Sequence, residues 1–473
     1  MKVYNTLTRR KEELTPLEEN HFKIYVCGPT VYDFFHIGNA RPFITFDTLR
    51  RYLEHSGYKV TYVQNFTDID DKVINRAHEE NTAISELTNR MIKEYFKDAD
   101  SLNIRRADIY PRATESIEDI IELIQMLEEK GFTYVSSDGV YFEIAKNPNY
   151  GKLSGKNVED LLAGASDRVG GKEDKKSPLD FVLWKFKKEG EPFWPSPWGD
   201  GRPGWHIECS AMTRATLGET IDLHCGGVDL VFPHHENEIA QSECATGKTF
   251  VRYWMHNGFI NIDKEKMSKS KGNFFLVRDL TAKYPPMVLR FFMLQAHYRM
   301  PINFEKDLLD AAVNSWQRIT NSVDNLKHVS AGAPAEAAGP QAQAAEKALA
   351  AAAAKAEAEW ERGMSDDLNT ADAIAAIFDL VRAANTAAAV PGVSGPALKA
   401  VRDKLLELLD VMGLDPALGS EVDIPAGIME LVERRQAAKK ERDFALADSL
   451  RDEIAAAGYK IEDTPQGPKV TVS

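Results

Sequence analysis

The stretch that decides how this chain is interpreted is GPTVYDFFHIGN, residues 28–39. It follows residues 22–27, FKIYVC, an apolar run that predicts a short buried strand. After it, apolar residues recur at helical spacing, so a helix is expected to begin near Gly38 and to be followed by a second strand over 58–65. This strand–turn–helix–strand order favours a parallel sheet with a ligand site at the carboxyl ends of the strands.

The turn between this strand and this helix is suited to binding phosphate. Gly38 allows close approach to the backbone, and a helix N-terminus offers free N–H groups and partial positive charge. His36 can donate a hydrogen bond as charge builds on a phosphoryl oxygen. Gly28, His36, Gly38 and Asn39 are therefore the candidate ATP-binding residues here, with His36 and Asn39 as catalytic candidates, although a four-residue string alone is often a chance match.

A second string, KMSKS at residues 266–270, is followed by Lys271-Gly272-Asn273. Lysines with small neighbours in a loop ending in glycine suit a cationic clamp on a leaving pyrophosphate, and Lys266 and Lys269 are the catalytic candidates, Lys269 also for ATP. A solvated lysine run is the ordinary alternative. The two strings lie in this order about 230 residues apart, and together they favour nucleotide chemistry.

Composition excludes several classes of protein. The 473 residues suggest about three domains, and 43% hydrophobic with 27% charged residues is typical of a globular chain rather than a disordered one. A net charge of −14 argues against non-specific nucleic-acid binding, but leaves room for an RNA partner held by local basic patches. No apolar run has the length of a membrane span, and the N-terminus lacks a signal core, so we expect a cytoplasmic protein without a membrane partner.

Four cysteines are too few for a disulfide framework, which leaves core packing or metal binding. His234 and Glu238 are four residues apart, a spacing that places both on one face of a helix and supplies half of a tetrahedral zinc site. Cys27 and Cys209 are the candidates for the other half, both expected where strands of the sheet end. The rival ligands, which the spacing leaves open, are His206, His224, His235, Cys225 and Cys244.

The two strings resemble the HIGH and KMSKS motifs of class I aminoacyl-tRNA synthetases, with Asn39 in place of the second histidine. The whole chain resembles the bacterial cysteinyl-tRNA synthetase family. The matching runs are YVCGPTVYD at 25–33, FTDIDDK at 66–72, PGWHIECSAM at 203–212 and FPHHENE at 232–238. The match is dense from the N-terminus past Lys271 and more diffuse beyond it.

This resemblance implies an α/β fold: a Rossmann-like parallel-sheet catalytic domain with an insertion, followed by an α-helical tRNA- and anticodon-binding region. It implies ATP-dependent ligation of L-cysteine to tRNA(Cys) through a cysteinyl-adenylate, with Mg²⁺ accompanying ATP. It also implies one Zn²⁺ held by Cys27, Cys209, His234 and Glu238. Because soft zinc ligation prefers a thiolate to a hydroxyl, the metal would separate cysteine from serine.

The other site residues are predicted from the same resemblance. Thr67, Trp205 and Asp229 are expected to bind the amino acid, with Asp229 also contacting ATP. Residues expected near the anticodon are Lys439, Asp448, Arg451 and Asp463, on a segment whose basic cluster is Arg434, Arg435, Lys439, Lys440 and Arg442. A solvated helix face is the alternative explanation of that cluster. The family is usually monomeric, so a monomer is expected.

Six regions are expected along the chain. They are the first half of the catalytic domain (1–130), a connective insertion (131–200), the second half (201–260), the KMSKS loop and stem-contact region (261–310), a helical bundle (311–415) and an anticodon-binding domain (416–473). Within them we predict a hairpin around 136–139 and a polar run over 163–177. Farther along, we predict a flexible tether over 330–342, helices over 343–362, 364–387, 397–412 and 426–457, and a final hairpin of 459–463 with 469–472.

Two other functions fit part of this pattern. A ligase of the same fold that joins cysteine to an amino sugar would keep the zinc site and both strings, but should lack the basic C-terminal module. A zinc-containing RNA-binding protein without catalysis would have no use for His36 and Lys269 at phosphate-binding positions. Cysteine-dependent ATP–pyrophosphate exchange and tRNA charging distinguish the three.

Overall fold

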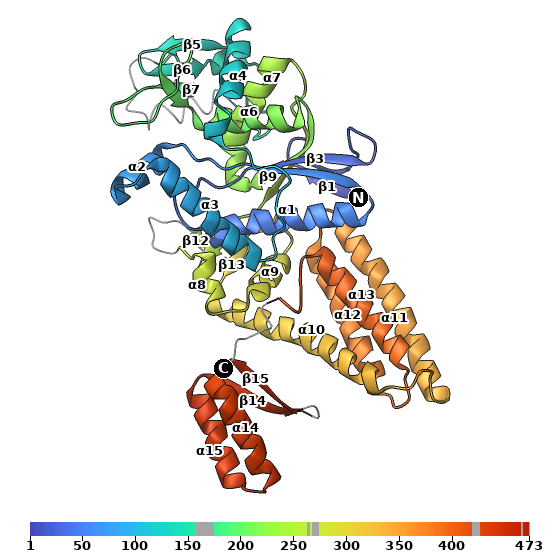
Figure 1. Ribbon diagram of the computed structural model, residues 1–473. Coiled ribbons are helices and arrows are strands. Elements are labelled where there is room, and N and C mark those ends of the chain that lie inside the picture. Colours follow the sequence, from blue (N-terminus) through green and yellow to red (C-terminus); the bar gives the residue numbers. More distant parts are fainter. Residues whose placement is uncertain (158–174, 263–264, 267–273, 419–425, 465–466, 473) are drawn as a thin grey trace. The chain divides into compact units, whose positions relative to one another are not determined.

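The computed structural model (Figure 1) describes residues 1–157, 175–262, 265–266, 274–418, 426–464 and 467–472. It divides into two compact units, Met1–Asp415 and Pro416–Ser473. Lys269 and most of the predicted polar run, residues 163–174, lie outside the described residues. The functional assignments of the six predicted regions stay predictions.

A four-stranded parallel sheet forms the centre of the first unit. In spatial order its strands are β10 (Val251–Asn257), β9 (Ile221–Gly227), β3 (His21–Val26) and β4 (Lys59–Gln64). Both strands predicted around the first motif are therefore confirmed, and the helix expected near Gly38 is α1 (Ile37–His55). The carboxyl ends of β3 and β9 lie side by side, since Val26 is in register with Cys225.

Alternate residues of β3 point to opposite faces of the sheet, as the strand period requires. Ile24 and Val26 belong to a core that includes buried residues of α1, whereas Tyr25 and Cys27 belong to a second core with α6 (Trp205–Leu217) and α7 (Glu236–Thr246). Helices thus cover both faces, which explains why the second half of β3, Ile24–Val26, is buried and apolar. The parallel-sheet fold predicted from the sequence is confirmed.

Helices and an antiparallel sheet flank this centre. The helices after β4 are α2 (Asp71–Glu80), α3 (Ile84–Ser101) and α4 (Ile117–Glu129), and the sheet contains β5 (Thr133–Ser136), β6 (Gly139–Phe142), β7 (Phe181–Phe186) and β8 (Gly201–Pro203). β5 and β6 form the predicted hairpin. α2 ends where Asn81 adopts a left-handed conformation with φ 55°.

Shorter elements complete the part of the first unit that precedes α10. They are the antiparallel pair β1 (Lys2–Asn5) and β2 (Arg10–Glu13), the three-stranded sheet of β12 (Glu265–Lys266), β11 (Ile260–Ile262) and β13 (Ile302–Phe304), and the helices α8 (Val277–Thr281) and α9 (Pro286–Leu294). β11 pairs parallel with β13 and antiparallel with β12. This small sheet follows β10 directly, and it carries the first lysine of the second motif.

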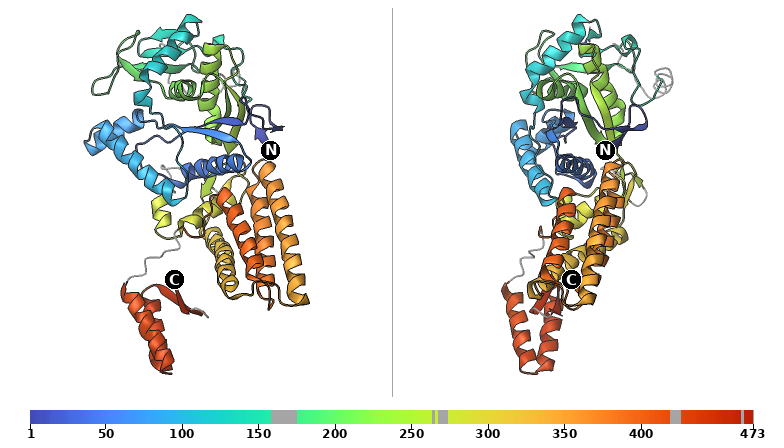
Figure 2. Two further views of the ribbon diagram at one scale, coloured as in Figure 1. Left: turned by 45° about the vertical axis from the view of Figure 1, so that its right-hand side comes forward. Right: turned by 90° about the vertical axis from the view of Figure 1, so that its right-hand side faces the viewer.

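Four helices pack side by side after β13, as Figures 1 and 2 both show. They are α10 (Lys306–Gly332), α11 (Pro340–Ser365), α12 (Thr370–Ala388) and α13 (Gly395–Val411). The tether predicted over 330–342 is confirmed in its middle, because residues 333–339 join two helices without a helix or strand of their own. It is wrong at both ends, because α10 continues to Gly332 and α11 begins at Pro340, and Ala342 in the first turn of α11 is buried.

The second unit contains α14 (Ala426–Lys440), α15 (Phe444–Ala456) and the hairpin of β14 (Tyr459–Thr464) with β15 (Gly467–Val472). The predicted hairpin is confirmed. The single helical stretch predicted over 426–457 is interrupted, because Arg442 has a positive φ of 64° and Asp443 caps the second helix. Among the described residues, no helix is long and apolar enough to cross a membrane.

Asp47 on α1 lies at a buried polar junction of the first unit. Its carboxylate accepts hydrogen bonds from Arg290 Nη2 at 2.6 Å and Arg51 Nε at 2.9 Å, and Asp47 is 2% exposed. We expect Asp47→Ala to lower the free energy of unfolding by about 3–5 kcal/mol, because it leaves a buried arginine without its counter-ion. Urea unfolding followed by circular dichroism measures this.

The matched control is Asp403→Ala on α13. Asp403 pairs with Arg402 at 2.8 Å, but its side chain is 50% exposed, so the loss should stay below about 1 kcal/mol. Equal unfolding midpoints for the two variants would contradict a structural role for the Asp47 junction.

Candidate active site

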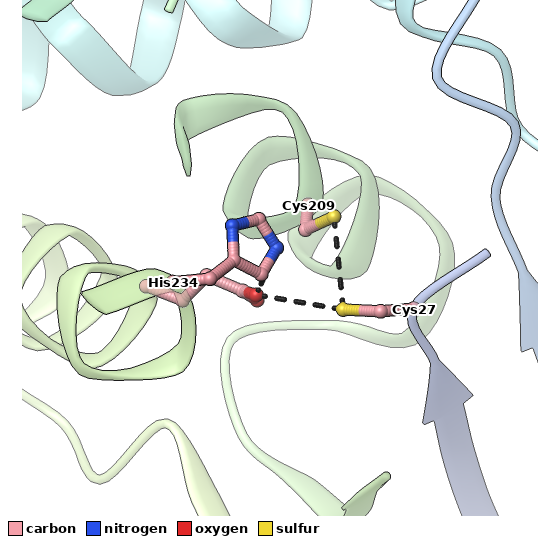
Figure 3. Close-up of side chains that lie close together, drawn as sticks. Cys27, Cys209 and His234 are labelled. Atoms are coloured by element: carbon pink, nitrogen blue, oxygen red, sulfur yellow. Dashed lines mark hydrogen bonds and ion pairs between the residues drawn. The ribbon is translucent and has the colours of Figure 1, made fainter. Parts of the chain in front are cut away.

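Four side chains from three parts of the first unit meet beyond the carboxyl end of β3. Cys27 follows the last residue of that strand, Cys209 comes from α6, and His234 and Glu238 come from the turn that leads into α7 and from α7 itself. All four residues are buried, and their ligand atoms lie within 4.8 Å of one another. Figure 3 shows the Cys27 and Cys209 sulfur atoms and the His234 ring directed toward one another.

The spacing of these atoms fits a tetrahedral metal ion. Ligands about 2.0–2.3 Å from zinc lie about 3.3–3.8 Å apart. Cys27 Sγ is 3.9 Å from Cys209 Sγ and 3.6 Å from Glu238 Oε1. Two sulfurs, an imidazole and a carboxylate are a donor set that zinc accepts. Glu238 Oε2 is buried without a hydrogen-bond partner among the described residues, as suits an oxygen that binds a cation.

A second group of ligands overlaps the first. Cys27 and Glu238 also lie near His224 and His235, and these four atoms again fall within 4.8 Å. Cys27 Sγ is 3.4 Å from His224 Nε2 and 3.3 Å from His235 Nε2. The rival histidines of the sequence are therefore real neighbours of the site. The structure brings the predicted four together, and the alternative set shares Cys27 and Glu238 with them.

Burial controls the protonation of this cluster. It lowers the pKa of His224, His235 and His206 well below the ordinary value, so these rings are neutral at physiological pH and able to bind a metal. The hydrogen bond from the Cys27 thiol lowers the pKa of Cys209 to about 7, whereas burial raises that of Cys27. One sulfur thus already tends toward the thiolate before any cation binds.

The predicted location of Cys209 is wrong. We expected it at the end of a strand, but it lies in the first half of α6, which faces the sheet at this point. The reason is that β8 ends at Pro203 and the chain enters a helix at Trp205, so the cysteine is carried on the helix face rather than on a strand. Its side chain still reaches the carboxyl end of β3.

His36 is the N-cap of α1, the helix that the first motif opens. Its Nδ1 accepts a hydrogen bond from the Asn39 N–H at 3.2 Å. In a neutral ring, this leaves the proton on Nε2, where it can be donated to an anion. His36 and Asn39 line a cavity of about 140 Å³. The cavity also contains Lys72, a cation that the sequence analysis did not single out.

Gly28 has a structural reason to be glycine. A Cβ atom there would lie 1.6 Å from the carbonyl oxygen of Asn65, and the Gly28 N–H donates to Asn65 Oδ1 at 2.8 Å. The close approach of the two chain segments after β3 and β4 thus demands this residue. Gly38 lies in the first turn of α1. Their predicted contacts with ATP stay predictions.

Thr67 and Trp205 both lie at this end of the sheet. Thr67 is buried, and its hydroxyl donates to Glu208 Oε2 at 3.1 Å. Trp205, 40% exposed, stacks on the His234 ring with centroids 4.5 Å apart. Glu208 was not among the site residues predicted from the sequence. It is fully buried on α6, and burial raises the pKa of its carboxyl well above the ordinary value. The signal that could have indicated it is its place in the matching run PGWHIECSAM, residues 203–212.

The remaining predicted site residues lie outside the cluster around Cys27. Asp229 is exposed in a short 3₁₀ turn, Val228–Leu230, after β9. Lys266 lies in β12, whose partner strand is β11. In the second unit, Lys439 is in the last turn of α14, Asp448 and Arg451 pair on α15 at 3.7 Å, and Asp463 is in β14.

Comparison with known proteins agrees with this geometry. The model of the class I (C) tRNA synthetase catalytic domain matches residues 13–314, a DALR domain matches 359–415, and the cysteinyl-tRNA ligase anticodon-binding domain matches 421–469. The cysteine–tRNA ligase of Caldicellulosiruptor saccharolyticus is 55% identical over 471 residues, which cover 99% of both chains. The chain belongs to the cysteine–tRNA ligase family. A further cysteine–tRNA ligase, from Clostridioides difficile, is 51% identical over 99% of each chain.

Solved structures confirm the fold of this cysteine–tRNA ligase family member. Mycobacterium tuberculosis methionyl-tRNA synthetase, in complex with methionyl-adenylate, has a TM-score of 0.62 at 18% identity and covers 90% of this chain and 96% of its own. The putative arginyl-tRNA synthetase from Campylobacter jejuni has a TM-score of 0.56 at 12% identity, with 85% and 94% covered. The predicted class I synthetase fold with a helical C-terminal region is confirmed.

Proposed function

We propose that this chain joins L-cysteine to tRNA(Cys) at the expense of ATP, through a cysteinyl-adenylate, with AMP and diphosphate as the other products. The carrying observation is the buried set of two thiols, an imidazole and a carboxylate at the carboxyl end of β3, in a chain 51–55% identical to curated cysteine–tRNA ligases. The two alternatives have no support, because the relatives named here are cysteine–tRNA ligases and an anticodon-binding domain is present.

The metal that best fits the ligand set is Zn²⁺, held by Cys27, Cys209, His234 and Glu238. When bound, it would attract the substrate sulfur as a thiolate. The hydroxyl of serine is a poorer ligand for zinc, so cysteine would be preferred. The chain supplies the shape around it. Trp205, stacked on His234, is proposed to form one wall around the substrate, and Thr67 offers a hydroxyl held in place by Glu208.

His36 is proposed to act on the phosphates. Its Nδ1 is occupied by the Asn39 N–H, which holds the ring and presents Nε2–H. This donor would stabilise the negative charge that develops as the cysteine carboxylate attacks the α-phosphorus and diphosphate leaves. Gly28, Gly38, Asn39 and Asp229 stay predicted ATP contacts, as do Lys266 and Lys269. Mg²⁺ is expected to accompany ATP.

The second unit is proposed to read the anticodon. We expect Arg451→Ala to raise the KM for tRNA(Cys) about 5- to 100-fold, the effect of one lost contact to a base or phosphate. Arg451 is 54% exposed and pairs with the 66% exposed Asp448 at 3.7 Å, so folding should be little affected. The measurement is the KM for tRNA(Cys) in aminoacylation.

Cysteine-dependent ATP–pyrophosphate exchange by Arg451→Ala should stay within twofold of the unsubstituted chain. Lys355→Ala on α11 is the control: it removes a 70% exposed lysine paired with Glu359 at 3.8 Å and should leave both assays unchanged. An unchanged KM for tRNA in the arginine variant would contradict the predicted anticodon contact. The roles of Lys439, Asp448 and Asp463, a monomeric state and a cytoplasmic location likewise stay predictions.

The deciding experiment is charging of a tRNA(Cys) transcript with cysteine and with serine. We expect cysteine to be preferred by at least about 10⁴-fold in kcat/KM. Exchange without charging would favour the amino-sugar ligase, and the absence of both would favour the non-catalytic protein.

A further inference from the structure

Arg41 is a buried cation one turn into α1, the helix that His36 caps. It is 1% exposed, and burial lowers the pKa of its guanidinium to about 10, so it remains charged at neutral pH. Its hydrogen bonds all go to main-chain carbonyl groups rather than to a carboxylate. The acceptors are Gly258, Phe259, His297, Tyr298 and Met300.

The two terminal nitrogens of Arg41 bind two different segments of chain. Nη1 donates to Gly258 and Phe259 at 2.8 and 2.7 Å, and these residues join β10 to β11. Nη2 donates to the segment 297–300, which precedes β13, for example to Tyr298 at 3.1 Å. One side chain therefore ties both parallel strands of the small sheet to α1.

The two segments also contact each other closely. The Gly258 N–H donates to the Tyr298 carbonyl at 2.8 Å, and the Ile302 N–H donates to the Phe259 carbonyl at 2.9 Å. A Cβ at Gly258 would lie 2.7 Å from the carbonyl oxygens of Arg299 and Met300, so the two backbone segments leave no space for a side chain here. Farther along, Asn261 of β11 is in register with Lys266 of β12.

The chain that follows the second motif returns to the same end of α1. The Ile37 N–H donates to the Phe275 carbonyl at 3.1 Å, and the Val277 N–H donates to the Phe35 carbonyl at 2.9 Å. The His36 turn is thus fixed to residues 275–277 by its own backbone. Within the described ranges, no backbone hydrogen bond joins that turn to β12, and Arg41 connects α1 to β12 through β11.

We propose that Arg41 is a positioning residue for adenylate formation: its forked guanidinium fixes β11, and through it the main chain at Lys266, relative to the phosphate-binding turn at His36. This inference rests on the proposed function. Lysine would keep the charge, but its single nitrogen cannot serve both segments from two sites. A displacement of about 1 Å of a group that orients a substrate can cost about 100-fold in rate.

The test compares Arg41→Lys with Arg50→Lys in the full-length, zinc-loaded protein. Arg50 is on the same helix and pairs with Glu54 and Asp108, both at 2.9 Å. In cysteine-dependent ATP–pyrophosphate exchange we expect Arg41→Lys to lower kcat about 10- to 100-fold, with the KM for cysteine within twofold. Arg50→Lys should match the unsubstituted chain.

A kcat for Arg41→Lys equal to that of the unsubstituted chain would overturn the proposal. So would a parallel loss of cysteine affinity, which would indicate general damage. Failure of the unsubstituted chain to catalyse exchange would instead refute the proposed function. A readout independent of catalysis is hydrogen–deuterium exchange, which should become faster at the Gly258 and Ile302 amides in Arg41→Lys and stay unchanged in Arg50→Lys.

Gly258→Ala provides a second route to the same junction, for use if Arg41→Lys folds poorly. The added methyl must separate Gly258 from Arg299 and Met300 while leaving Arg41 intact. We expect the same selective loss of kcat. A Gly258→Ala protein with unchanged kcat but faster exchange of these amides would show that the junction does not control the rate, and would overturn the proposal.

Discussion

Replacing Cys209 with alanine should remove the metal and most of the activity of this protein. The variant loses one of four ligands and leaves Cys27 Sγ without the sulfur that lies 3.9 Å away. Loss of an outer partner of a metal ligand already costs about 10- to 100-fold in metal affinity or activity, so loss of a ligand should cost at least about 100-fold in kcat/KM for cysteine. Zinc content after dialysis and cysteine-dependent ATP–pyrophosphate exchange measure the two effects.

Cys244→Ala is the matched control for this prediction. Cys244 is partly buried on α7, outside both groups of candidate ligands, so the variant should retain one zinc per chain and full exchange activity. A Cys209→Ala protein that still held one zinc and still rejected serine would contradict the assignment. It would favour the overlapping set of Cys27, His224, His235 and Glu238.

Replacing His36 with alanine should reduce the chemical step without affecting the metal. One preorganised donor to a developing charge contributes about 10²–10³ in kcat, so exchange should slow by that factor. Zinc content and the KM for cysteine should stay close to those of the unsubstituted chain, because His36 is absent from both ligand groups. Steady-state exchange at saturating cysteine and ATP measures the effect.

His55→Ala at the other end of α1 is the control for His36→Ala. His55 is exposed and contacts the Trp360 ring edge-on at 5.9 Å, so its loss should leave exchange within twofold. Loss of zinc from His36→Ala would contradict a role confined to the phosphates. So would a drop in kcat equal to that of His55→Ala.

Much of the fold could be predicted because local patterns and tertiary packing agree. The run Ile24–Tyr25–Val26 is buried and apolar since helices cover both sides of the sheet, and Gly28-Pro29 after it marks the end of the strand. Where the two disagree, the predicted boundaries are wrong. The alanine- and glycine-rich stretch 330–342 indicated a linker, and residues 333–339 do join two helices, but α10 and α11 extend into both ends of the stretch, which composition does not reveal.

The sequence by itself determined the strand–turn–helix at 22–55 and the four-residue spacing of His234 and Glu238, because each depends on neighbours along the chain. Only the tertiary structure decided that Cys209 reaches Cys27 from a helix, that His224 and His235 surround the same sulfur, and that Arg41 binds two segments more than 200 residues away. These contacts join residues far apart in the chain, and their geometry follows from how helices pack on a sheet, which no local pattern records.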